Sequence, residues 1–297
     1  ESMSNMPLLY SEDMTEFFME LMKAKSPQAK LKVLSSFKLP YLSPVIAIEQ
    51  GLTDPFCGLN MGQTAEKLAR EFGLTREVQD AFANESHRRA NMAQAEGKFN
   101  DEIVPIIAGK NLSQLMSEDN GPRKDSSMEK LAKLKPFFEK QTGTVTVGNA
   151  CPITDGGSVW LMCSEEAVKK YDLKPMARLI DYHFQGLGPE RMGMGPLVAI
   201  DGLLRRTKLE LDQIDLFEIN EAFAVVTMAA MKDLDLPAEK VNIHGGACAL
   251  GHPVGASGTR ILVTLISALQ KYGKTRGIAS LCIGGGEATA MAVEVLN

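Results

Sequence analysis

The last third of the sequence contains three turns in which polar side chains stand among glycines. Asn220–Phe223 follows the apolar run IDLFEI, His244–Gly258 carries two histidines, and Cys282 stands two residues before Gly284–Gly286. A thiol and an imidazole can transfer protons and attack carbonyl groups, and an amide or the main-chain N–H groups of a glycine turn can stabilise an oxyanion. Together these residue types indicate thiol-based acyl chemistry.

Each of these residues also has a plainer structural interpretation. Asn220 suits the N-cap of the helix expected after it, which is the commoner role of asparagine at such a position. His244 ends an expected strand and is best interpreted as a hydrogen-bonded structural histidine. For His252 a structural and a catalytic role are equally good interpretations, because a flexible glycine-rich turn offers an imidazole little core to pack against.

Glycine is concentrated around these turns, and other catalytic signatures are missing. Residues 245–286 contain ten of the 26 glycines. Glycine is needed where φ is positive or where a ligand approaches the backbone closely. The sequence has no G-x-G-x-x-G after a strand, no P-loop and no G-x-S-x-G motif. Nucleotide hydrolysis and serine esterase chemistry are therefore disfavoured.

The composition is that of a mildly acidic globular protein. Its 297 residues include 32 Lys and Arg against 37 Asp and Glu, a net charge of −5, with 44% hydrophobic and 23% charged residues. No apolar run is long enough to cross a bilayer, and the basic residues are dispersed, so we expect neither a membrane span nor nucleic-acid binding. The five widely spaced cysteines favour free thiols in a reducing, cytoplasmic setting over disulfides or a zinc site.

Before Gly143 the sequence is typical of helices. Apolar residues recur at spacings of three and four in SEDMTEFFMELMKAK, and later segments repeat the pattern. Thr64 lies in the expected cap region of the second helix. Residues 26–50 are expected to be irregular, because Pro40 and Pro44 interrupt any long element. Helices are expected over 11–25, 61–73, 75–97 and 128–140.

After Gly143 short β-rich runs alternate with amphipathic helices, which is typical of βα units on a mostly parallel sheet. Strands are expected over 143–149, 157–163, 214–219, 241–244, 277–283 and 287–295. Helices are expected over 164–173, 221–234 and 257–273. Ser164 and Ser257 are the expected N-caps of the first and last of these helices.

Several motifs resemble those of the thiolases, acyl-CoA acyltransferases that cleave or join 3-ketoacyl-CoA. Three of them, in the family's order, are NEAFA (220–224), NIHGGACALGHPVGASGTR (242–260) and LCIGGGEATAMAVE (281–294). Five stretches upstream resemble the family's loop domain and the end of its first half. They are ESMSNMP, GLTDPFCGLNMGQTAEKLARE, TREVQDAFANESHRRA, MEKLAKLKPFF and GTVTVGNACPITDGG. The resemblance covers essentially the whole chain.

The resemblance implies catalytic roles for four residues. His252 corresponds to the histidine that takes the proton from the nucleophilic cysteine, and with a water held by Asn220 it would form one oxyanion hole. Cys282 corresponds to the second cysteine, the acid/base that removes an α-proton in condensation and returns it in cleavage. Gly284 would lend its backbone N–H to the other oxyanion hole.

The resemblance also implies how coenzyme A is held. Arg123 stands where a contact to a CoA phosphate or adenine is common, and Cys151 stands where members often have a serine near the pantetheine. CoA enters as a substrate, and neither a metal nor a redox cofactor is implied.

Three departures from the family pattern bear on function. The motif with the acylated cysteine is not found in the sequence, and Cys57 is a poor substitute, because no helix N-terminus follows its sulfur. We therefore expect this chain alone to be inactive, with the first half of the fold largely missing. Pro7 is followed by Leu8, where short-chain biosynthetic members commonly have histidine. The stretch 11–44 is similar to that of β-oxidation thiolases that work in multienzyme complexes.

The resemblance thus predicts an α/β thiolase fold with duplicated halves, αβαβα layers and a mostly helical loop domain. Residues 1–142 would form the loop domain, 143–172 the end of the first α/β half and 173–297 the C-terminal half. The complete protein would be a homodimer or homotetramer, with a β-oxidation complex as a further partner.

The predicted reaction is CoA-dependent cleavage of 3-ketoacyl-CoA to acyl-CoA and acetyl-CoA, as in fatty acid β-oxidation, or the reverse condensation. Two alternatives remain open at this point. One is a short-chain biosynthetic thiolase that forms acetoacetyl-CoA. The other is a non-catalytic fragment that binds CoA or a partner, although such a module would not need the set formed by Asn220, His252 and Cys282.

Overall fold

The computed structural model describes residues 1–109 and 111–296. A sheet in the order β5-β8-β7-β6 lies at its centre, formed by β5 (Ala177–Gly186), β6 (Leu216–Ile219), β7 (Arg276–Ile283) and β8 (Glu287–Val295). Only β6 and β7 are parallel, since β8 runs antiparallel to both β7 and β5. The expectation of a mostly parallel sheet is wrong for these strands, because a short glycine turn joins β7 to β8 and leaves no chain for a crossover helix.

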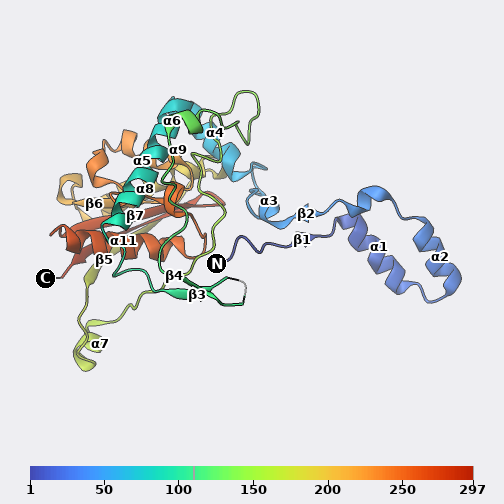
Figure 1. The fold of residues 1–297 in the computed structure, drawn as a ribbon, viewed down its shortest axis with the longest axis horizontal. Helices are drawn as coiled ribbons and strands as arrows, with labels where there is room; N and C mark the ends of the chain where they lie inside the picture. The colour runs from blue at the N-terminus through green and yellow to red at the C-terminus, as the bar shows by residue number, and fades with distance from the viewer. Residues whose placement is uncertain (110, 297) are drawn as a thin grey trace.

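Helices cover both faces of this sheet (Figure 1). α8 (Gly195–Thr207) buries Ile200 and Leu203 against one face, where they meet the alanines of β8. α11 (Ser257–Lys271) buries Ile261 and Leu265 against the other face. Successive residues of each strand point to opposite faces, so an apolar strand in the middle of this sheet needs a helix on each side.

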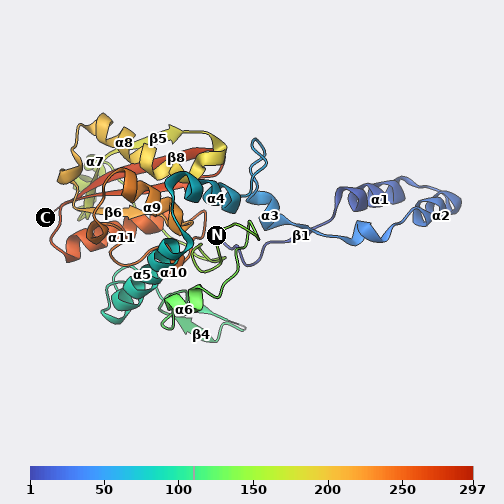
Figure 2. The same ribbon diagram turned by 90° about the horizontal axis from the view of Figure 1, so that it is seen from above.

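Two helices from the first third of the chain pack beside α9 (Ala224–Asp233), as Figure 2 shows. They are α4 (Met61–Phe72) and α5 (Arg76–Ala95), which confirms the predicted helices in these regions. Leu68 of α4 shares a buried cluster with Val226 of α9. The C-terminal elements are thus covered by helices that precede them by more than 100 residues in the sequence.

The N-cap of α4 differs from the expected one. The side chain of Asn60 accepts a hydrogen bond from the N–H of Gly62 at 3.0 Å, and Gln63 completes a capping box. Thr64 lies inside the helix, where its hydroxyl donates to the carbonyl of Met61 at 2.7 Å. The sequence signal for this N-cap is Asn60, which stands one residue before Met61, the first apolar residue of the helix.

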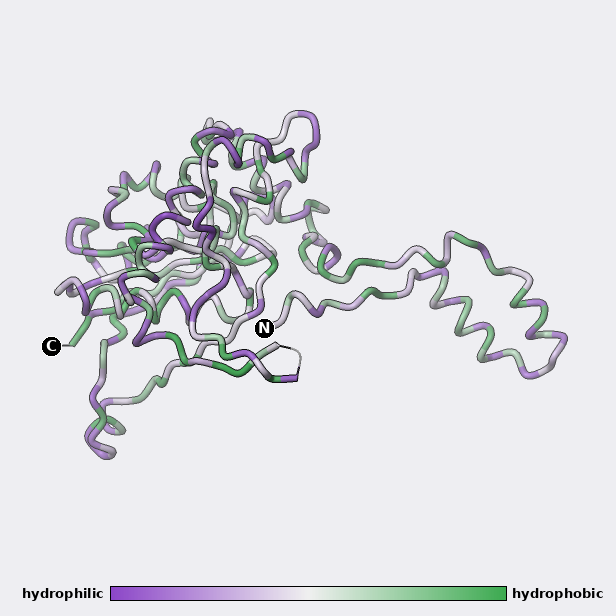
Figure 3. The backbone as a smooth tube through the Cα atoms, in the orientation of Figure 1, coloured by the Kyte–Doolittle hydropathy of each residue, from purple (hydrophilic) through white to green (hydrophobic). Residues whose placement is uncertain are grey.

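A helical arm, residues 8–46, projects from the body (Figures 1 and 2). Its stem is a two-stranded ribbon, β1 (Leu8–Leu9) with β2 (Val45–Ile46), and its tip contains α1 (Glu12–Lys23) and α2 (Pro27–Ser35). Hydrophobic and hydrophilic residues alternate along the arm (Figure 3). The expectation that residues 26–50 are irregular is wrong for α2, because Ser26 caps this helix and Pro27 fits its first turn. The short helices Leu39–Leu42 and Ala47–Gly51 follow it.

Several predicted elements are absent or shorter. Residues 143–149 and 157–163 form no strand, and 241–244 contribute only an isolated bridge from Val241 to Phe217. A β-rich run becomes a strand only beside another strand, and no strand in the described ranges pairs with 143–149 or 157–163. The helix expected over 128–140 is limited to α6 (Met128–Leu131), because Pro136 removes a backbone donor and its ring opposes a continuing helix.

The remaining elements are short and connect the larger ones. They are β3 (Ile106–Ala108), β4 (Gln114–Met116), α7 (Glu165–Lys170), α10 (Ala247–Leu250) and the 3₁₀ helices Pro189–Met194, Leu211–Gln213 and Ala238–Lys240. Within the described ranges no helix has the length and apolar character to cross a membrane.

Candidate active site

Asn220 lies at the C-terminal end of β6 and is only 1% exposed. Its backbone N–H donates to the carbonyl of Ser280 at 3.0 Å, which fixes it beside β7. Neither its side-chain oxygen nor its side-chain nitrogen has a hydrogen-bond partner among the described residues. The N-cap interpretation is wrong, because α9 begins only at Ala224 with Phe223 at its cap. A buried amide with both polar atoms unpaired is costly unless it serves a ligand or water.

His252 lies in the turn between α10 and α11. Its Nδ1 is 2.6 Å from Oγ of Ser257, and its backbone N–H donates to Oγ1 of Thr154 at 3.2 Å. Burial, and next the positive charge of Arg260, lower the pKa of His252 to about 4. The imidazole is therefore neutral at pH 7 and is able to accept a proton.

Cys282 is the penultimate residue of β7 and is 6% exposed. Burial raises the pKa of its thiol to about 11. α8 can approach it because residue 195 is glycine: a Cβ there would lie 3.3 Å from Cβ of Cys282 and 2.6 Å from Cβ of Ala288. Cys282 is thus a protonated thiol in an apolar setting at neutral pH.

Cys151 is brought to the same region by backbone hydrogen bonds. Its N–H donates to the carbonyl of Ala222 at 3.1 Å, and the N–H of Ala224 donates to the carbonyl of Asn149 at 2.9 Å. Burial, followed by the proximity of Cys282, raises the pKa of the Cys151 thiol to about 12. The structure therefore brings together Asn220, Cys151 and Cys282, which are distant in the sequence.

The glycine turn after Cys282 is held by an aspartate that sequence reasoning missed. Gly285 and Gly286 have φ values of 85° and 81°, which favour glycine. The N–H of Gly285 donates to Oδ2 of Asp54 at 3.1 Å, and Oδ1 of the same carboxylate accepts from the N–H of Cys57 at 3.0 Å. The N–H of Gly284 makes no hydrogen bond within the described part of the chain.

Arg123 is exposed in the loop before α6. Its backbone N–H donates to Nδ1 of His87 at 3.1 Å. The loop packs closely on α10: a Cβ at Gly121 would lie 2.4 Å from the carbonyl oxygen of Ala249. Arg123 therefore belongs to a loop that borders the His252 turn, and no contact of its guanidinium with the other candidate residues is observed in the described residues.

Glu221, which sequence reasoning also missed, links the turns that carry Asn220 and His252 to α5. Its carboxylate accepts hydrogen bonds from the hydroxyl of Ser86 at 2.7 Å, the N–H of Cys248 at 3.0 Å and the side-chain amide of Asn242 at 2.8 Å. It is 1% exposed. The one charged residue of the motif NEAFA, directly before the apolar residues Ala222–Ala224, was the signal available in the sequence.

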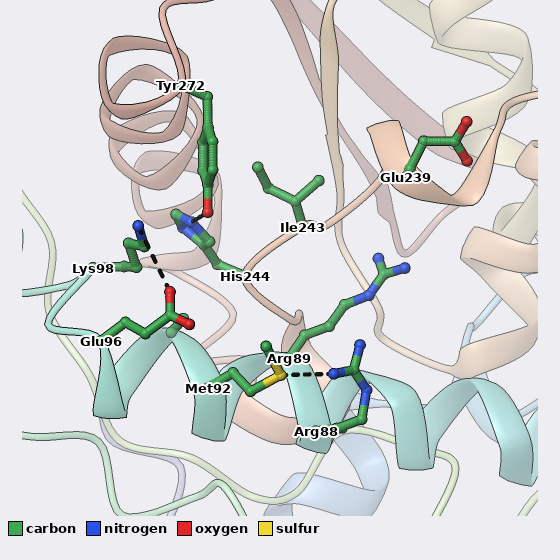
Figure 4. Close-up of a pocket in the computed structure, with 10 residues that line it drawn as sticks. Arg88, Arg89, Met92, Glu96, Lys98, Glu239, Ile243, His244 and Tyr272 are labelled. Carbon is green, nitrogen blue, oxygen red and sulfur yellow. Dashed lines mark hydrogen bonds and ion pairs between the residues drawn. The ribbon is translucent and has the colours of Figure 1, made fainter.

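A cavity of about 220 Å³ lies apart from these residues, between the C-terminal part of α5 and Tyr272 (Figure 4). His244 lines it and lies edge-to-face with Phe99 and tilted against Tyr272, with ring centroids 5.7 Å apart in both cases. Its Nε2 is 3.4 Å from the Tyr272 hydroxyl oxygen. This supports the structural interpretation of His244. Each of the three cations here has a carboxylate partner: Lys98 pairs with Glu96 at 3.7 Å, and Arg88 and Arg89 share Glu85 at 2.6 Å and 2.8 Å.

Sequence models of known families match nearly the whole chain. The thiolase N-terminal domain matches residues 1–166 and the thiolase C-terminal domain matches residues 173–295. Both domains are thus represented, which corrects the expectation that the chain lacks most of the N-terminal half. The chain nevertheless spans only part of the length of its relatives.

A probable acetyl-CoA acyltransferase of Staphylococcus aureus is 44% identical over 273 residues, which are 91% of this chain and 69% of the relative. The structure of Bacillus anthracis acetyl-CoA acetyltransferase superposes with a TM-score of 0.82 at 44% identity, covering 86% of this chain and 64% of that one. Human mitochondrial 3-ketoacyl-CoA thiolase in complex with CoA gives a TM-score of 0.79 at 38% identity, with 88% and 66% covered.

A third solved structure, Acat5 thiolase from Ascaris suum in complex with coenzyme A, covers all of this chain and 70% of its own, with a TM-score of 0.82 at 36% identity. These similarities agree with the order of the motifs and with the fold described above. The chain belongs to the thiolase family and has the thiolase fold.

Proposed function

We propose that the protein is an acyltransferase that cleaves 3-ketoacyl-CoA with CoA to acyl-CoA and acetyl-CoA, or runs the reverse condensation. The observation that carries the proposal is the buried, unpaired amide of Asn220 at the strand edge that also presents Cys282. A neutral imidazole, a protonated thiol and unpaired donors are what a thioester mechanism needs. The names of the thiolase relatives support the same reaction class.

The proposed roles follow the chemistry of each group. His252, neutral at pH 7, accepts the proton of the nucleophilic thiol, and with a water on Asn220 it forms one oxyanion hole. Cys282, whose thiol pKa is raised to about 11, transfers the α-proton of the acetyl unit: its thiolate is a strong base and its thiol a proton donor. The N–H of Gly284 serves the second oxyanion hole.

For substrate binding, we propose that Arg123 contacts a CoA phosphate or adenine and that Cys151 lies beside the pantetheine. Arg123 is exposed on a loop that packs against α10, so a guanidinium there can meet an anion outside the catalytic turns. Cys151 hydrogen-bonds through its N–H to Ala222, close to Asn220.

We further propose that the acyl group is carried on a cysteine other than the five present here. Burial raises the pKa values of Cys151, Cys248 and Cys282, which makes each a poor nucleophile at neutral pH. Cys163 is exposed outside any helix, and Cys57 lies in the Asp54 turn. Incubation with acetyl-CoA followed by peptide mass spectrometry should find no acylated cysteine; an acyl group on any of the five would contradict this proposal.

The test of the reaction is a thiolysis assay with acetoacetyl-CoA and a long-chain 3-ketoacyl-CoA, on protein of recorded intact mass. The 297-residue chain is expected to be inactive alone and active when joined to the N-terminal segment of the Staphylococcus aureus relative. In that chimera Cys282→Ala and Asn220→Ala should reduce kcat, whereas the exposed Cys163→Ser should not. An inactive chimera that still binds CoA would favour the non-catalytic alternative.

We propose a degradative role over a biosynthetic one, with β-oxidation as its setting and a cytoplasmic location. Support comes from the arm, whose sequence is similar to that of β-oxidation thiolases in multienzyme complexes, and from Leu8 after Pro7. Preference for the long-chain substrate in the thiolysis assay would support it.

We also propose that the complete protein is a homodimer or homotetramer, which size-exclusion chromatography with light scattering tests. We propose the same division of the chain as above: a loop domain over 1–142, the end of the first α/β half over 143–172 and the C-terminal half over 173–297.

A further inference from the structure

Asp54 divides its two carboxylate oxygens between two turns of the chain. Oδ1 accepts hydrogen bonds from the backbone N–H groups of Phe56 at 2.8 Å and Cys57 at 3.0 Å, which closes the turn that Asp54 itself begins. Oδ2 accepts from the N–H of Gly285 at 3.1 Å. Asp54 is only 2% exposed. A single buried carboxylate therefore joins a local turn to the glycine turn that follows Cys282.

The backbone around Asp54 is fixed by hydrogen bonds of its own. The N–H of Asp54 donates to the carbonyl of Leu59 at 2.9 Å, and its carbonyl accepts from the N–H of Gly58 at 2.8 Å. Met61, the first residue of α4, donates its N–H to the carbonyl of Leu52 at 2.9 Å. The carboxylate is thus carried by a closed turn at the start of α4, which gives it a defined position beside the glycine turn.

The glycine turn is also held from its other side. The carbonyl of Gly286 accepts from the N–H of Leu187 at 2.8 Å, and a Cβ at Gly286 would lie 2.2 Å from the carbonyl oxygen of Leu187. Only three residues separate β7 from β8, so contacts at Gly285 and Gly286 leave little freedom for Gly284. Gly284 is exposed, and its N–H is the unpaired donor described above.

A carboxylate is a costly choice beside a donor that would stabilise an oxyanion, because its negative charge opposes the charge that develops there. Asparagine would avoid that charge. However, an asparagine side chain has one acceptor atom, and its NH₂ group would face an N–H group in one of the two turns. Donors from both turns meet Asp54, so the position requires two acceptor oxygens and no donor.

We propose that Asp54 is a positioning residue of the oxyanion hole: by accepting the N–H of Gly285, it leaves the N–H of the preceding Gly284 unpaired and fixed towards the substrate's carbonyl oxygen. The proposal rests on the proposed thiolase function for the identity of the oxygen that Gly284 binds. The state of the Gly284 amide itself is a property of this chain and is measured without turnover.

The variant that tests the proposal is Asp54→Asn. Asparagine forms the local turn with Phe56 and Cys57 as readily as aspartate does, so the substitution breaks mainly the hydrogen bond to Gly285. NMR of the chain labelled with 13C at isoleucine carbonyls and 15N at glycines isolates one amide signal, because Ile283–Gly284 is the only Ile-Gly dipeptide in the sequence. This Gly284 signal is expected to shift and broaden in Asp54→Asn.

The catalytic consequence is measured in the active chimera. A donor that is no longer held in place stabilises the oxyanion less, whereas substrate binding through the rest of CoA is unaffected. Asp54→Asn should therefore lower kcat about 10- to 100-fold and leave KM unchanged.

Asp215→Asn is the matched control. Oδ2 of Asp215 also accepts two backbone N–H groups, those of Thr275 at 2.9 Å and Arg276 at 3.0 Å, but at the opposite end of β7. This variant should leave both the Gly284 signal and kcat as in the wild type, even if it lowers stability.

An unchanged Gly284 signal in a folded Asp54→Asn protein, or an equal change in Asp215→Asn, would overturn the proposal. A kcat equal to or above that of the wild-type chimera would overturn it as well. Asp54→Ser, whose shorter side chain can keep the local turn, is the second variant. Failure of both Asp54 variants to fold would assign Asp54 a purely structural role and would also overturn the proposal. An inactive wild-type chimera with the expected NMR changes would instead reject only the proposed function.

Discussion

Nδ1 of His252 and Oγ of Ser257 are 2.6 Å apart, and this contact determines which imidazole nitrogen carries the proton. The Ser257 hydroxyl has a single proton, which it donates to the carbonyl of Pro253 at 2.9 Å. Its oxygen can therefore only accept from His252, so Nδ1 is the protonated nitrogen. Nε2 is left as the acceptor, which is the state a general base requires. Ser257, expected to cap α11, is the first residue of that helix and orients His252 instead.

Ser257→Ala should therefore change the tautomer of His252 and lower activity. Without the hydroxyl, Nδ1–H loses its acceptor, and the population with the proton on Nε2 rises. 15N chemical shifts of the imidazole should move towards the Nε2–H tautomer, and kcat of the active chimera should fall about 10- to 100-fold. Ser35→Ala, at an exposed position of the arm, is the control. Unchanged 15N shifts would contradict this assignment.

Glu221→Gln should destabilise the protein although the two side chains have nearly the same shape. Ser86, Asn242 and the N–H of Cys248 all donate to the Glu221 carboxylate. The NH₂ group of glutamine would face a donor in place of an acceptor, leaving buried polar groups unpaired. Urea unfolding should show a loss of about 1–3 kcal/mol.

The matched control for that variant is Glu20→Gln, on an exposed face of α1, for which no loss is expected. A Glu221→Gln protein as stable as the control would mean that the carboxylate is not needed to join α5 to the two turns.

The pH dependence of stability should be flatter in Glu218→Gln. Burial raises the pKa of Glu218 to about 8, whereas the unfolded chain releases this proton near the ordinary value of 4.5. Between these values the native state holds the proton and the unfolded state does not, so the free energy of unfolding falls as pH rises. Glu102 and Asp119, raised by the same cause, leave part of the slope in place.

Urea unfolding at several pH values from about 5 to 8 measures that slope. Glutamine is neutral throughout, so the variant should lose less stability than the wild type across this window. Slopes that agree within error would show that Glu218 ionises in the native state as readily as in the unfolded chain.

Trypsin should cut the arm before it cuts the body. The segment between α1 and α2 contains Lys25, and the arm is tied back in the described structure by a ribbon with only two residues in each strand. Local opening there costs little, whereas cleavage at Arg89 requires α5 to unfold. Mass spectrometry at short times should find the first cut at Lys23 or Lys25. A first cut at Lys124, in the Arg123 loop, would show that this loop opens more easily than the arm.

Helices with strong local signals, such as α4 and α5, and the glycine-rich turns could be predicted from the sequence. α8 and β5 were not predicted, and α2 lies in a segment expected to be irregular. The helix of α4 follows from its apolar spacing and Gly73, whose φ of 61° closes it. The segment 157–163 has the composition of a strand, yet Val159 is 88% exposed and the run pairs with no described strand. Strand formation depends on a neighbour distant in the sequence, which local patterns do not contain.

The same distinction applies to the candidate site. His252 and Cys282 stand out by residue type and by the glycines around them. Glu221 and Asp54 act through contacts with residues that local patterns cannot pair with them, such as the hydrogen bond from Gly285 to Asp54 across 231 positions. Local sequence signals thus identify reacting groups more readily than the residues that hold them in place.

The hydrogen bond from Ser86 to Glu221 joins residues 135 positions apart, and this has a consequence for synthesis in the cell. At about 5–20 residues per second, Ser86 of α5 leaves the ribosome roughly 7 to 27 seconds before Glu221. During that interval Leu68 and Ala83, buried in the finished protein, have no α9 or α10 to cover them. We therefore expect the growing chain to bind chaperones that cover exposed apolar surface until translation is complete.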